Sequence, residues 1–594
     1  MRTVKKLLSV LLALLLLLAA TPAAFAAGPF GEIGADPDTF PEVFDLRDVD
    51  GISYVTPVKS QSPFGTCWGF AAIASAETSI LSSGLAAQLG YTAETLDLSE
   101  KHLAYFAQSV IDDEEDPQFG EGMISLVEDS GTDPSADRYA TGGVPLFATG
   151  LFAAGTGPVV EEADEQFVYR GKNGNTVTGT DENGELYDYC YSPEDDWSID
   201  EDLRWTQSFV LKESYVVDGP TYNGEEDEES WRAQVNAVKD LLFSGHAVQV
   251  GFCADVSMPG QASVTDYINT DNWAHYTYEP VGANHAVTIV GWDDRYPREN
   301  FAHPIEDWVF DDEAGTAVLT TMDSPIPEHD GAWLVKNSWG SEEREFPNRL
   351  GWGMLQGQDR GVYNEETGKY EYNALEDAVH TGYFWLSYED HSTMLLEALE
   401  FDLVTALEGY YVAEHDYMPV ESIRVQVQDE PVQMANIFSV DEGLPPVRLD
   451  WVSCQTGSPN TRARFDVYLL EDGASLPTEG TRVSGAEAEY LYAGFHKVRL
   501  DTPVWLYGGQ RFSVVLTQEV EEDGRTGYSF NIQTNLTPSG AELIGETFYA
   551  SGVVNPGESL FLFRGAWHDL ADPITQAALL QDALDPGRRK NVLD

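Results

Sequence analysis

Residues 61–70 read QSPFGTCWGF, and they place a cysteine directly before an apolar run. Apolar residues recur at helical spacing from Cys67 to about Ser83, and Gly84 then supplies a stop signal. A cysteine that opens a helix lies beside free backbone N–H groups and positive potential. Both lower the pKa of its thiol and favour the nucleophilic thiolate. This stretch therefore predicts a reactive cysteine at the start of a helix.

Two neighbours of this cysteine fit a role in acyl transfer. Gln61 can offer a side-chain amide N–H beside the backbone N–H of Cys67, and two such donors would hold the oxyanion of a tetrahedral intermediate. Gly65 lacks a side chain and so permits a tight approach of the loop to the helix.

Two later segments supply a base and a group to orient it. Residues 284–292 read NHAVTIVGW, which predicts a strand with a histidine near its start. At a sheet edge that faces a cleft, His285 could take the thiol proton and return it to the leaving amine. Residues 333–340 read WLVKNSWG. The Asn337 carbonyl can accept a hydrogen bond from the imidazole, and Trp339 could shield that bond from water.

In this order the segments resemble the papain family of cysteine peptidases. The resemblance implies that Cys67 is the nucleophile, His285 the base and Asn337 the orienting residue. It also implies that Gln61 belongs to the oxyanion hole. The residues that would line the substrate cleft are Gly65, Trp68, Gly142, Gly143, Asn284 and Trp339.

The chain departs from the family pattern at several points. Phe64 stands where the family's motif has its first cysteine, so the usual disulfide at that place is absent. The base and the orienting residue also follow the nucleophile at more than the typical distance of roughly 130–150 residues. Insertions at about 157–230 and 293–330 account for the difference. We expect the first, which is rich in acidic clusters, to lie as a solvated insertion on a globular frame that could overhang the cleft.

The composition limits the classes of partner. The chain has 594 residues with 100 acidic and 33 basic side chains, which gives a net charge of −67. Such a surface repels nucleic acids and anionic membranes, so neither is expected as a partner. Solubility and calcium binding both remain open as reasons for the acid, although no D-x-D-x-D-G loop is present. No C-x-x-C or H-E-x-x-H spacing occurs, so we expect no metal and no cofactor.

The cysteines do not form a disulfide scaffold, because there are only 4 in a long chain. If Cys67 is a free thiol, at most one bridge can form among Cys190, Cys253 and Cys454. The pair Cys190–Cys253 is plausible, although spacing alone does not establish it.

The first residues have the form of a signal peptide. Basic residues precede an apolar run at 7–20, and Ala24-Phe25-Ala26 fits a cleavage site, so residues 1–26 predict export. The run is short for a membrane span. Residues 27–43 then form a short pro-segment or linker. We expect the mature chain to be secreted or associated with the cell surface, and to have no membrane span.

The hydrophobic pattern of the sequence changes at about residue 394. Short alternating runs recur from there and predict a β-sandwich. In placement and texture, residues 394–567 resemble the lectin-like sandwich that follows papain-type domains in some secreted proteins of Gram-positive bacteria. The resemblance implies a cell-surface glycan as partner, and a purely structural role stays open. A tail at 568–594 contains a predicted helix at 574–584. The predicted sandwich strands include 465–469, 512–516, 528–532 and 560–563.

The sequence thus predicts an α+β protein. A papain-like catalytic domain at 44–393, with a helical lobe and a β lobe, precedes an all-β sandwich. The predicted function is that of a secreted cysteine peptidase that hydrolyses peptide bonds of protein or peptide substrates through a Cys-His-Asn triad and an acyl-enzyme. Two alternatives stay open: an inactive surface or carbohydrate-binding protein on the same scaffold, and acyl transfer to an acceptor other than water.

Overall fold

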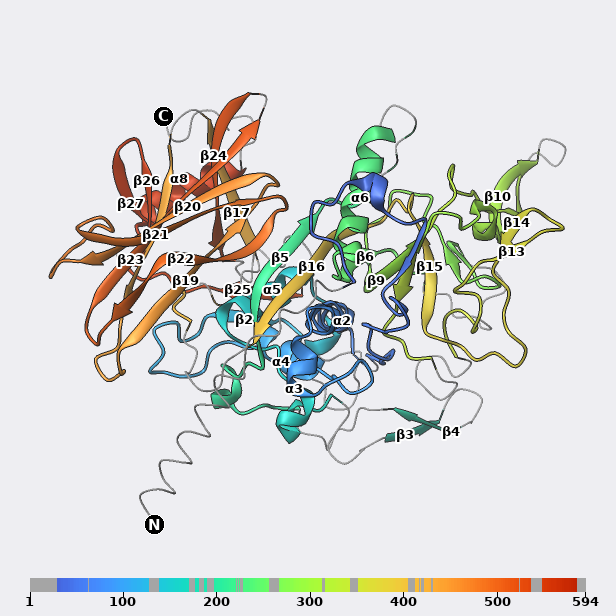
Figure 1. Ribbon diagram of the computed structural model, residues 1–594, viewed down its shortest axis with the longest axis horizontal. Helices are drawn as coiled ribbons and strands as arrows, with labels where there is room; N and C mark the ends of the chain where they lie inside the picture. The colour runs from blue at the N-terminus through green and yellow to red at the C-terminus, as the bar shows by residue number, and fades with distance from the viewer. Residues whose placement is uncertain are drawn as a thin grey trace, which may run out of the picture.

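Figure 1 shows the course of the chain in the structure, which is a computed structural model. It describes residues 29–584, with short gaps. The predicted signal peptide at 1–26, Cys190 and residues 585–594 lie outside the described residues. Within them, no helix combines the length and the apolar character that a bilayer span needs. The gaps are 62–63, 128–137, 170–176, 181–185, 190–196, 221, 223, 225–227, 256–265, 312–315, 342–350, 404–411, 416, 418–420, 429–430, 523 and 536–546.

Helix α2 (Cys67–Ser82) forms the centre of the helical lobe, and every residue between its two ends is buried. It is rich in alanine, a strong helix former whose small side chain lets neighbouring elements approach. Gly84 follows with a φ of +76°, a left-handed conformation that favours glycine. The helix predicted from Cys67 to about Ser83 is therefore confirmed. The other helices of this lobe are α3 (Leu85–Leu89), α4 (Glu100–Ala107) and α5 (Pro145–Ala154).

One sheet of 11 strands forms the β lobe and extends toward the C-terminal domain (Figure 1). Its path is β19-β22-β5-β16-β6-β9-β12-β15-β8-β7, and β1 pairs with β9. The strands predicted at 246–252 and 285–291 are confirmed as β6 and β9. Its strands before residue 404 are β1 (Val43–Asp45), β5 (Phe209–Val217), β6 (Val248–Phe252), β7 (Ile268–Asn269), β8 (Ala274–His275), β9 (His285–Asp293), β12 (Ala332–Lys336), β15 (Tyr383–Ser387) and β16 (Met394–Leu403).

Helices cover both faces of this sheet, so β9 is buried along its whole length. On one face, Val287 and Ile289 share a core with the apolar residues of α6 (Glu228–Phe243). On the other face, Ala286 packs with α2, and Thr288 Oγ1 donates a hydrogen bond to a backbone carbonyl of α2 at 3.2 Å. This double cover fixes the start of β9 beside the first turn of α2.

Two strands of the central sheet differ from the sequence-based expectation. Strand β5 lies within the region predicted as a solvated insertion, yet Phe209 and Leu211 are almost fully buried. Strand β16 lies beyond the predicted domain boundary at 393, yet it pairs with β5 and β6. The physical reason is the same for both. An alternating apolar run does not show which sheet it joins, because the pairing depends on segments far away in the sequence.

The C-terminal domain is a sandwich of two β layers closed by helix α8 (Pro573–Leu584) (Figure 1). Strands β19 and β22 pack their apolar side chains against those of β20 and β23 in one core. The strands and the helix predicted here are confirmed. The strands are β17 (Glu421–Gln428), β18 (Gln433–Ser439), β19 (Val447–Thr456), β20 (Thr461–Leu470), β21 (Gly480–Tyr490), β22 (Gly494–Leu506), β23 (Arg511–Glu522), β24 (Arg525–Thr534), β26 (Ser559–Phe563) and β27 (Ala566–Asp569).

Strand pairing joins the two domains. Strand β22 meets β5 at His496 and Glu213, whose side chains lie 2.5 Å apart. Strand β25 (Phe548–Ser551) pairs with β2 (Gly122–Ser125) of the N-terminal domain. The remaining hairpins are β3 (Val177–Thr180) with β4 (Leu186–Tyr189), β10 (Pro304–Asp311) with β11 (Thr316–Asp323), and β13 (Val362–Asn364) with β14 (Lys369–Glu371).

Candidate active site

Cys67 is the first residue of α2, as the sequence predicts. Its thiol packs against Ala286 at the start of β9, and the backbone N–H of Ala286 reaches the sulfur. Burial raises the pKa of the Cys67 thiol. The N–H groups of Ala286, Trp68 and Cys67 itself act in the opposite direction. The helix start is therefore not enough to ionise this thiol, and a nearby positive charge is needed.

His285 opens β9 and is held by two side chains that follow β12. Its Nε2 lies 2.8 Å from the Asn337 side-chain oxygen, and the ring of Trp339 stacks on the imidazole with centroids 4.6 Å apart. Burial lowers the pKa of His285 to about 4. Proton transfer would need the other ring nitrogen, Nδ1, to face the thiol of Cys67. The structure records no hydrogen bond between these two side chains, both of which it describes.

Gln61 is tied to the loop after β12 by two hydrogen bonds to Ser338. The backbone N–H of Gln61 donates to the Ser338 carbonyl at 2.8 Å, and its side-chain oxygen accepts from the Ser338 hydroxyl at 2.8 Å. Its Nε2 donates to the Phe64 carbonyl at 2.9 Å. An amide nitrogen carries two hydrogens, so the second remains available for a substrate oxygen.

The glycines predicted to line the cleft stand where the chain passes close to a neighbour. A Cβ at Gly143 would lie 2.5 Å from the Trp68 indole, and one at Gly65 would lie 2.8 Å from the Ala140 carbonyl oxygen. Gly142 has a φ of +81°, which favours glycine. The loop before α5 can therefore lie directly on Trp68, next to Cys67.

Two family models match the chain. The model of the papain family of cysteine proteases matches residues 40–104, and that of a lectin-like domain matches residues 414–579. These matches identify a papain-family cysteine protease segment and, after it in the same chain, a lectin-like domain. The resemblance stated from the sequence motifs is thereby confirmed.

Two solved structures share the fold of this peptidase over most of its length. One is a variant of the clostridial cysteine protease Cwp84 after propeptide cleavage, which is 19% identical with a TM-score of 0.54 and covers 89% of this chain and 94% of its own. The other holds the cysteine protease and lectin-like domains of Cwp84, a surface layer associated protein of Clostridium difficile. It is 19% identical with a TM-score of 0.55 and covers 91% of this chain and 86% of its own. The α+β fold class is confirmed. No curated protein matches the peptidase.

Asn284, the last predicted cleft residue, is bound to the backbone of its own lobe. Its side-chain oxygen accepts from the Ala254 N–H at 2.8 Å, and its Nδ2 donates to the Ala254 carbonyl at 3.1 Å. The neighbouring Cys253 is a free thiol, and Cys190, its suggested partner, lies outside the described residues.

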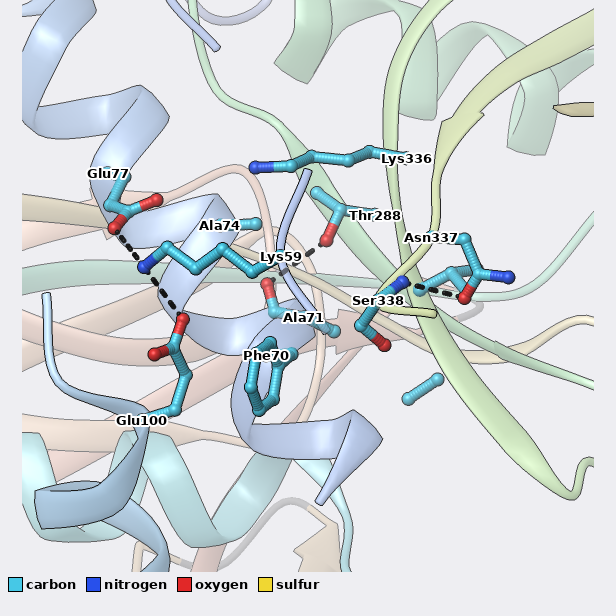
Figure 2. Close-up of a pocket in the computed structure, with 12 residues that line it drawn as sticks. Lys59, Phe70, Ala71, Ala74, Glu77, Glu100, Thr288, Lys336, Asn337 and Ser338 are labelled. Atoms are coloured by element: carbon cyan, nitrogen blue, oxygen red, sulfur yellow. Dashed lines mark hydrogen bonds and ion pairs between the residues drawn. The ribbon is translucent and has the colours of Figure 1, made fainter. Parts of the chain in front are cut away.

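A buried charged cluster that no sequence motif predicted lies between the two lobes (Figure 2). Lys59 Nζ lies 2.9 Å from Glu77, 2.8 Å from Glu100 and 2.6 Å from Asp97. Lys336 of β12 reaches into the same small cavity, which Asn337 also lines. One signal was present in the sequence, because Glu77 is the only charged residue of α2.

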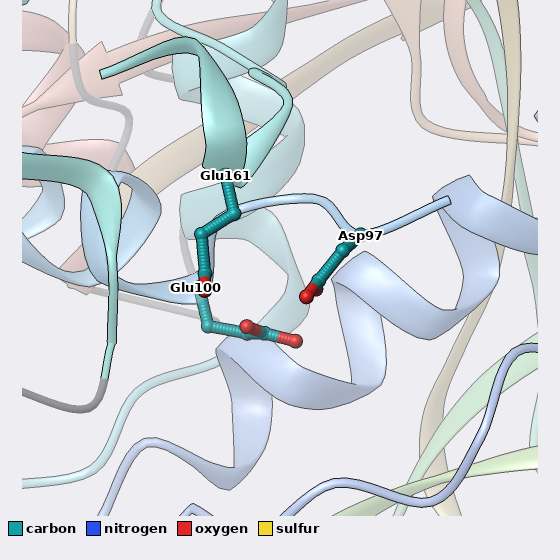
Figure 3. Close-up of side chains that lie close together, drawn as sticks. All are labelled: Asp97, Glu100 and Glu161. Atoms are coloured by element: carbon teal, nitrogen blue, oxygen red, sulfur yellow. The ribbon is translucent and has the colours of Figure 1, made fainter. Parts of the chain in front are cut away.

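Carboxylates outnumber cations in this cluster. Asp97, Glu100 and Glu161 bring oxygens within 4.8 Å of one another (Figure 3). Burial raises the pKa of Glu100 to about 8 and that of Glu161 to about 7, and burial lowers the pKa of Lys336 to about 8. The Lys59 ammonium accounts for the convergence of the acids, so they need no metal ion to explain it.

Proposed function

We propose that this peptidase is exported and hydrolyses peptide bonds of proteins or peptides, with Cys67 as nucleophile, His285 as base and Asn337 as the orienting residue. The observation that carries the proposal is the 2.8 Å contact between His285 Nε2 and the Asn337 oxygen, stacked under Trp339. It occurs on the strand whose first residues touch the thiol of Cys67.

The first half of the reaction forms the acyl-enzyme. His285 takes the proton of the Cys67 thiol, and the sulfur attacks the peptide carbonyl carbon. The tetrahedral intermediate collapses as the C–N bond breaks. The leaving amine takes the proton from the imidazolium, and a thioester remains on Cys67.

The second half regenerates the thiol. A water molecule gives a proton to His285 and attacks the thioester carbon. The C–S bond then breaks, the sulfur recovers the proton and the carboxylic acid leaves. An amine acceptor in place of water would give acyl transfer with the same groups.

The oxyanion of each tetrahedral intermediate needs donors that are already in place. The backbone N–H of Cys67 and the second hydrogen of Gln61 Nε2 are suited to this role. The hydrogen bonds to Ser338 and Phe64 restrict the Gln61 amide plane, so little reorganisation is needed when charge develops.

Burial also favours ionisation of the Cys67 thiol and the His285 imidazole as a pair over ionisation of either group alone. Burial raises the pKa of Cys67 and lowers the pKa of His285 to about 4, so neither charge is favoured alone. A thiolate and an imidazolium in contact would each offset the desolvation cost of the other. Asn337 is neutral and orients the ring without competing for its proton.

A thiol-directed epoxide tests the nucleophile. We expect the full chain to be labelled once and to cleave fluorogenic peptides, and Cys67→Ala to lose both properties. Cys253→Ala is the matched control, because Cys253 is another free, partly exposed thiol. Its labelling and turnover should equal those of the wild type. A wild-type chain that takes no label and cuts no peptide would support the inactive surface-binding alternative.

We further propose that the peptidase works outside the cell, where its lectin-like domain binds a surface glycan. Support comes from the signal-like residues 1–26 and from the fold shared with Cwp84, which is a surface layer associated protein. Trp505 and Tyr507 of the sandwich are each 53% exposed, and Trp and Tyr are residue types enriched at binding interfaces. A glycan array probed with the Cys67→Ala chain tests the binding. Loss of a glycan signal in Trp505→Ala would support it, and an array without signal would contradict it.

A further inference from the structure

An aromatic cluster packs beside the loop that leads to the nucleophile, and the predicted insertion contributes two of its members, Tyr169 and Trp197. We call Phe64, Phe70, Tyr139, Tyr169 and Trp197 the aromatic brace. Its ring centroids lie 4.6 Å apart for Phe64 and Trp197, 5.0 Å for Phe70 and Tyr169, and 5.2 Å for Tyr169 and Trp197. The family's motif would have a cysteine at position 64. Here an aromatic side chain at that position packs in the brace.

One hydroxyl of the brace reaches both ends of the loop. The Tyr169 hydroxyl is bonded to the backbone carbonyl of Gln61 and lies 2.8 Å from Thr66 Oγ1. A carbonyl can only accept, so the Tyr169 hydrogen points to Gln61 and the Thr66 hydroxyl must donate to Tyr169. Tyr169 is buried, so these bonds are shielded from water.

This contact explains an unusual feature at the start of α2. Thr66 occupies the N-cap position, where a threonine hydroxyl normally accepts from an N–H of the first turn. Its side chain makes no such bond here. Because Tyr169 holds that hydroxyl, the first N–H groups of α2 stay available to the sulfur of Cys67, and the N–H groups of Cys67 and Trp68 do act on its pKa.

We propose that Tyr169 is a positioning residue for acyl transfer: it fixes Gln61 beside the oxyanion and keeps Thr66 from capping the helix that carries the nucleophile. The inference rests on the proposed roles of Cys67 and Gln61. It gives the segment after residue 157 a function in the chemistry, although the sequence alone suggested a solvated loop.

Tyr169→Phe in the full chain tests this, because it keeps the ring and removes the hydroxyl. After normalisation to titrated thiol, we expect kcat to fall about tenfold with KM within about twofold, since loosening one oxyanion donor costs less than the roughly 100-fold or more seen when a donor is deleted. The inhibition constant of a peptide aldehyde should rise by a similar factor, because the thiol adds to its carbonyl and creates an oxyanion.

Alkylation of Cys67 by iodoacetamide distinguishes a misplaced oxyanion donor from a general loss of thiol reactivity. The sulfur displaces iodide without forming an oxyanion, so its limiting rate at high pH should match the wild type. The pH midpoint of alkylation should rise, because Thr66 is then free to cap α2. Tyr492→Phe is the matched control. It loses a tyrosine hydroxyl bond of 2.7 Å to Asp240 and should keep wild-type kinetics.

If the wild type is active, either of two results for Tyr169→Phe would overturn the inference. One is an unchanged kcat and aldehyde constant in Tyr169→Phe. The other is an increase in KM with kcat preserved. A wild type that cleaves nothing would instead overturn the proposed function itself.

Discussion

Lys59 neutralises the buried acidic cluster behind the active site, and replacing it with methionine should strongly destabilise the peptidase lobe. The side chains of Glu77 and Glu100 are only 1% and 3% exposed, and the lysine nitrogen lies within 2.9 Å of both. Methionine has a similar length but no charge. The substitution would therefore leave buried carboxylates without their cation.

The expected loss is about 3–5 kcal/mol at pH 7, the usual cost of breaking a buried ion pair by removing one partner. For a domain of this size, such a loss corresponds to a fall in Tm of roughly 10 °C. It should shrink toward pH 5, because carboxyl groups that lack a cation become neutral there and no longer oppose burial.

Differential scanning calorimetry of the full chain measures this shift. Arg232→Met is the matched control, because Arg232 pairs with Glu228 at 2.6 Å and the two side chains are 59% and 38% exposed. An exposed pair contributes about 0–1 kcal/mol, so its Tm should change little. Equal Tm values for the two variants, or a Lys59→Met loss that does not depend on pH, would refute the reasoning.

Three further variants test other parts of the structure. Asn337→Ala removes the acceptor at 2.8 Å from His285 and should lower kcat for peptide cleavage at least tenfold. Circular dichroism should show that the variant is folded. Full activity would refute the orienting role of Asn337. Burial raises the pKa of Glu161 to about 7, above its unfolded value. Its stabilising contribution is therefore complete below about pH 4.5 and is lost as pH rises toward 7. Glu161→Gln should thus flatten the decline of Tm over this range, and an unchanged Tm profile would count against it. Gly143→Ala would place a Cβ 2.5 Å from the Trp68 indole, so we expect a lower Tm and a changed KM; wild-type values of both would contradict the packing argument.

Much of the fold was predictable where a local pattern sets the structure. The alanine-rich run after Cys67 predicts α2, and the alternating run from His285 predicts β9. Both are confirmed, because helical and strand periodicity depend only on near neighbours. The positions of β5 and β16 were not predictable in this way. Both runs are compatible with more than one sheet, and only long-range pairing decides between them.

The candidate site divides in the same manner. The order of the motifs in the sequence was enough to identify four candidate site residues: Gln61, Cys67, His285 and Asn337. In the structure, the Asn337 side-chain oxygen lies 2.8 Å from His285 Nε2. The charged cluster around Lys59 gave almost no signal in the sequence, because its members come from separate segments. A lone charge in α2 was the single hint of it.

The sequence by itself determined which residue types begin α2 and β9 and in what order the reactive groups occur along the chain. Tertiary structure alone decided that Tyr169 meets Gln61 and Thr66, and that Lys59 is surrounded by carboxylates. The physical reason is that propensity and periodicity act over a few residues, whereas such contacts join side chains that are distant in the chain and meet only when the lobes pack.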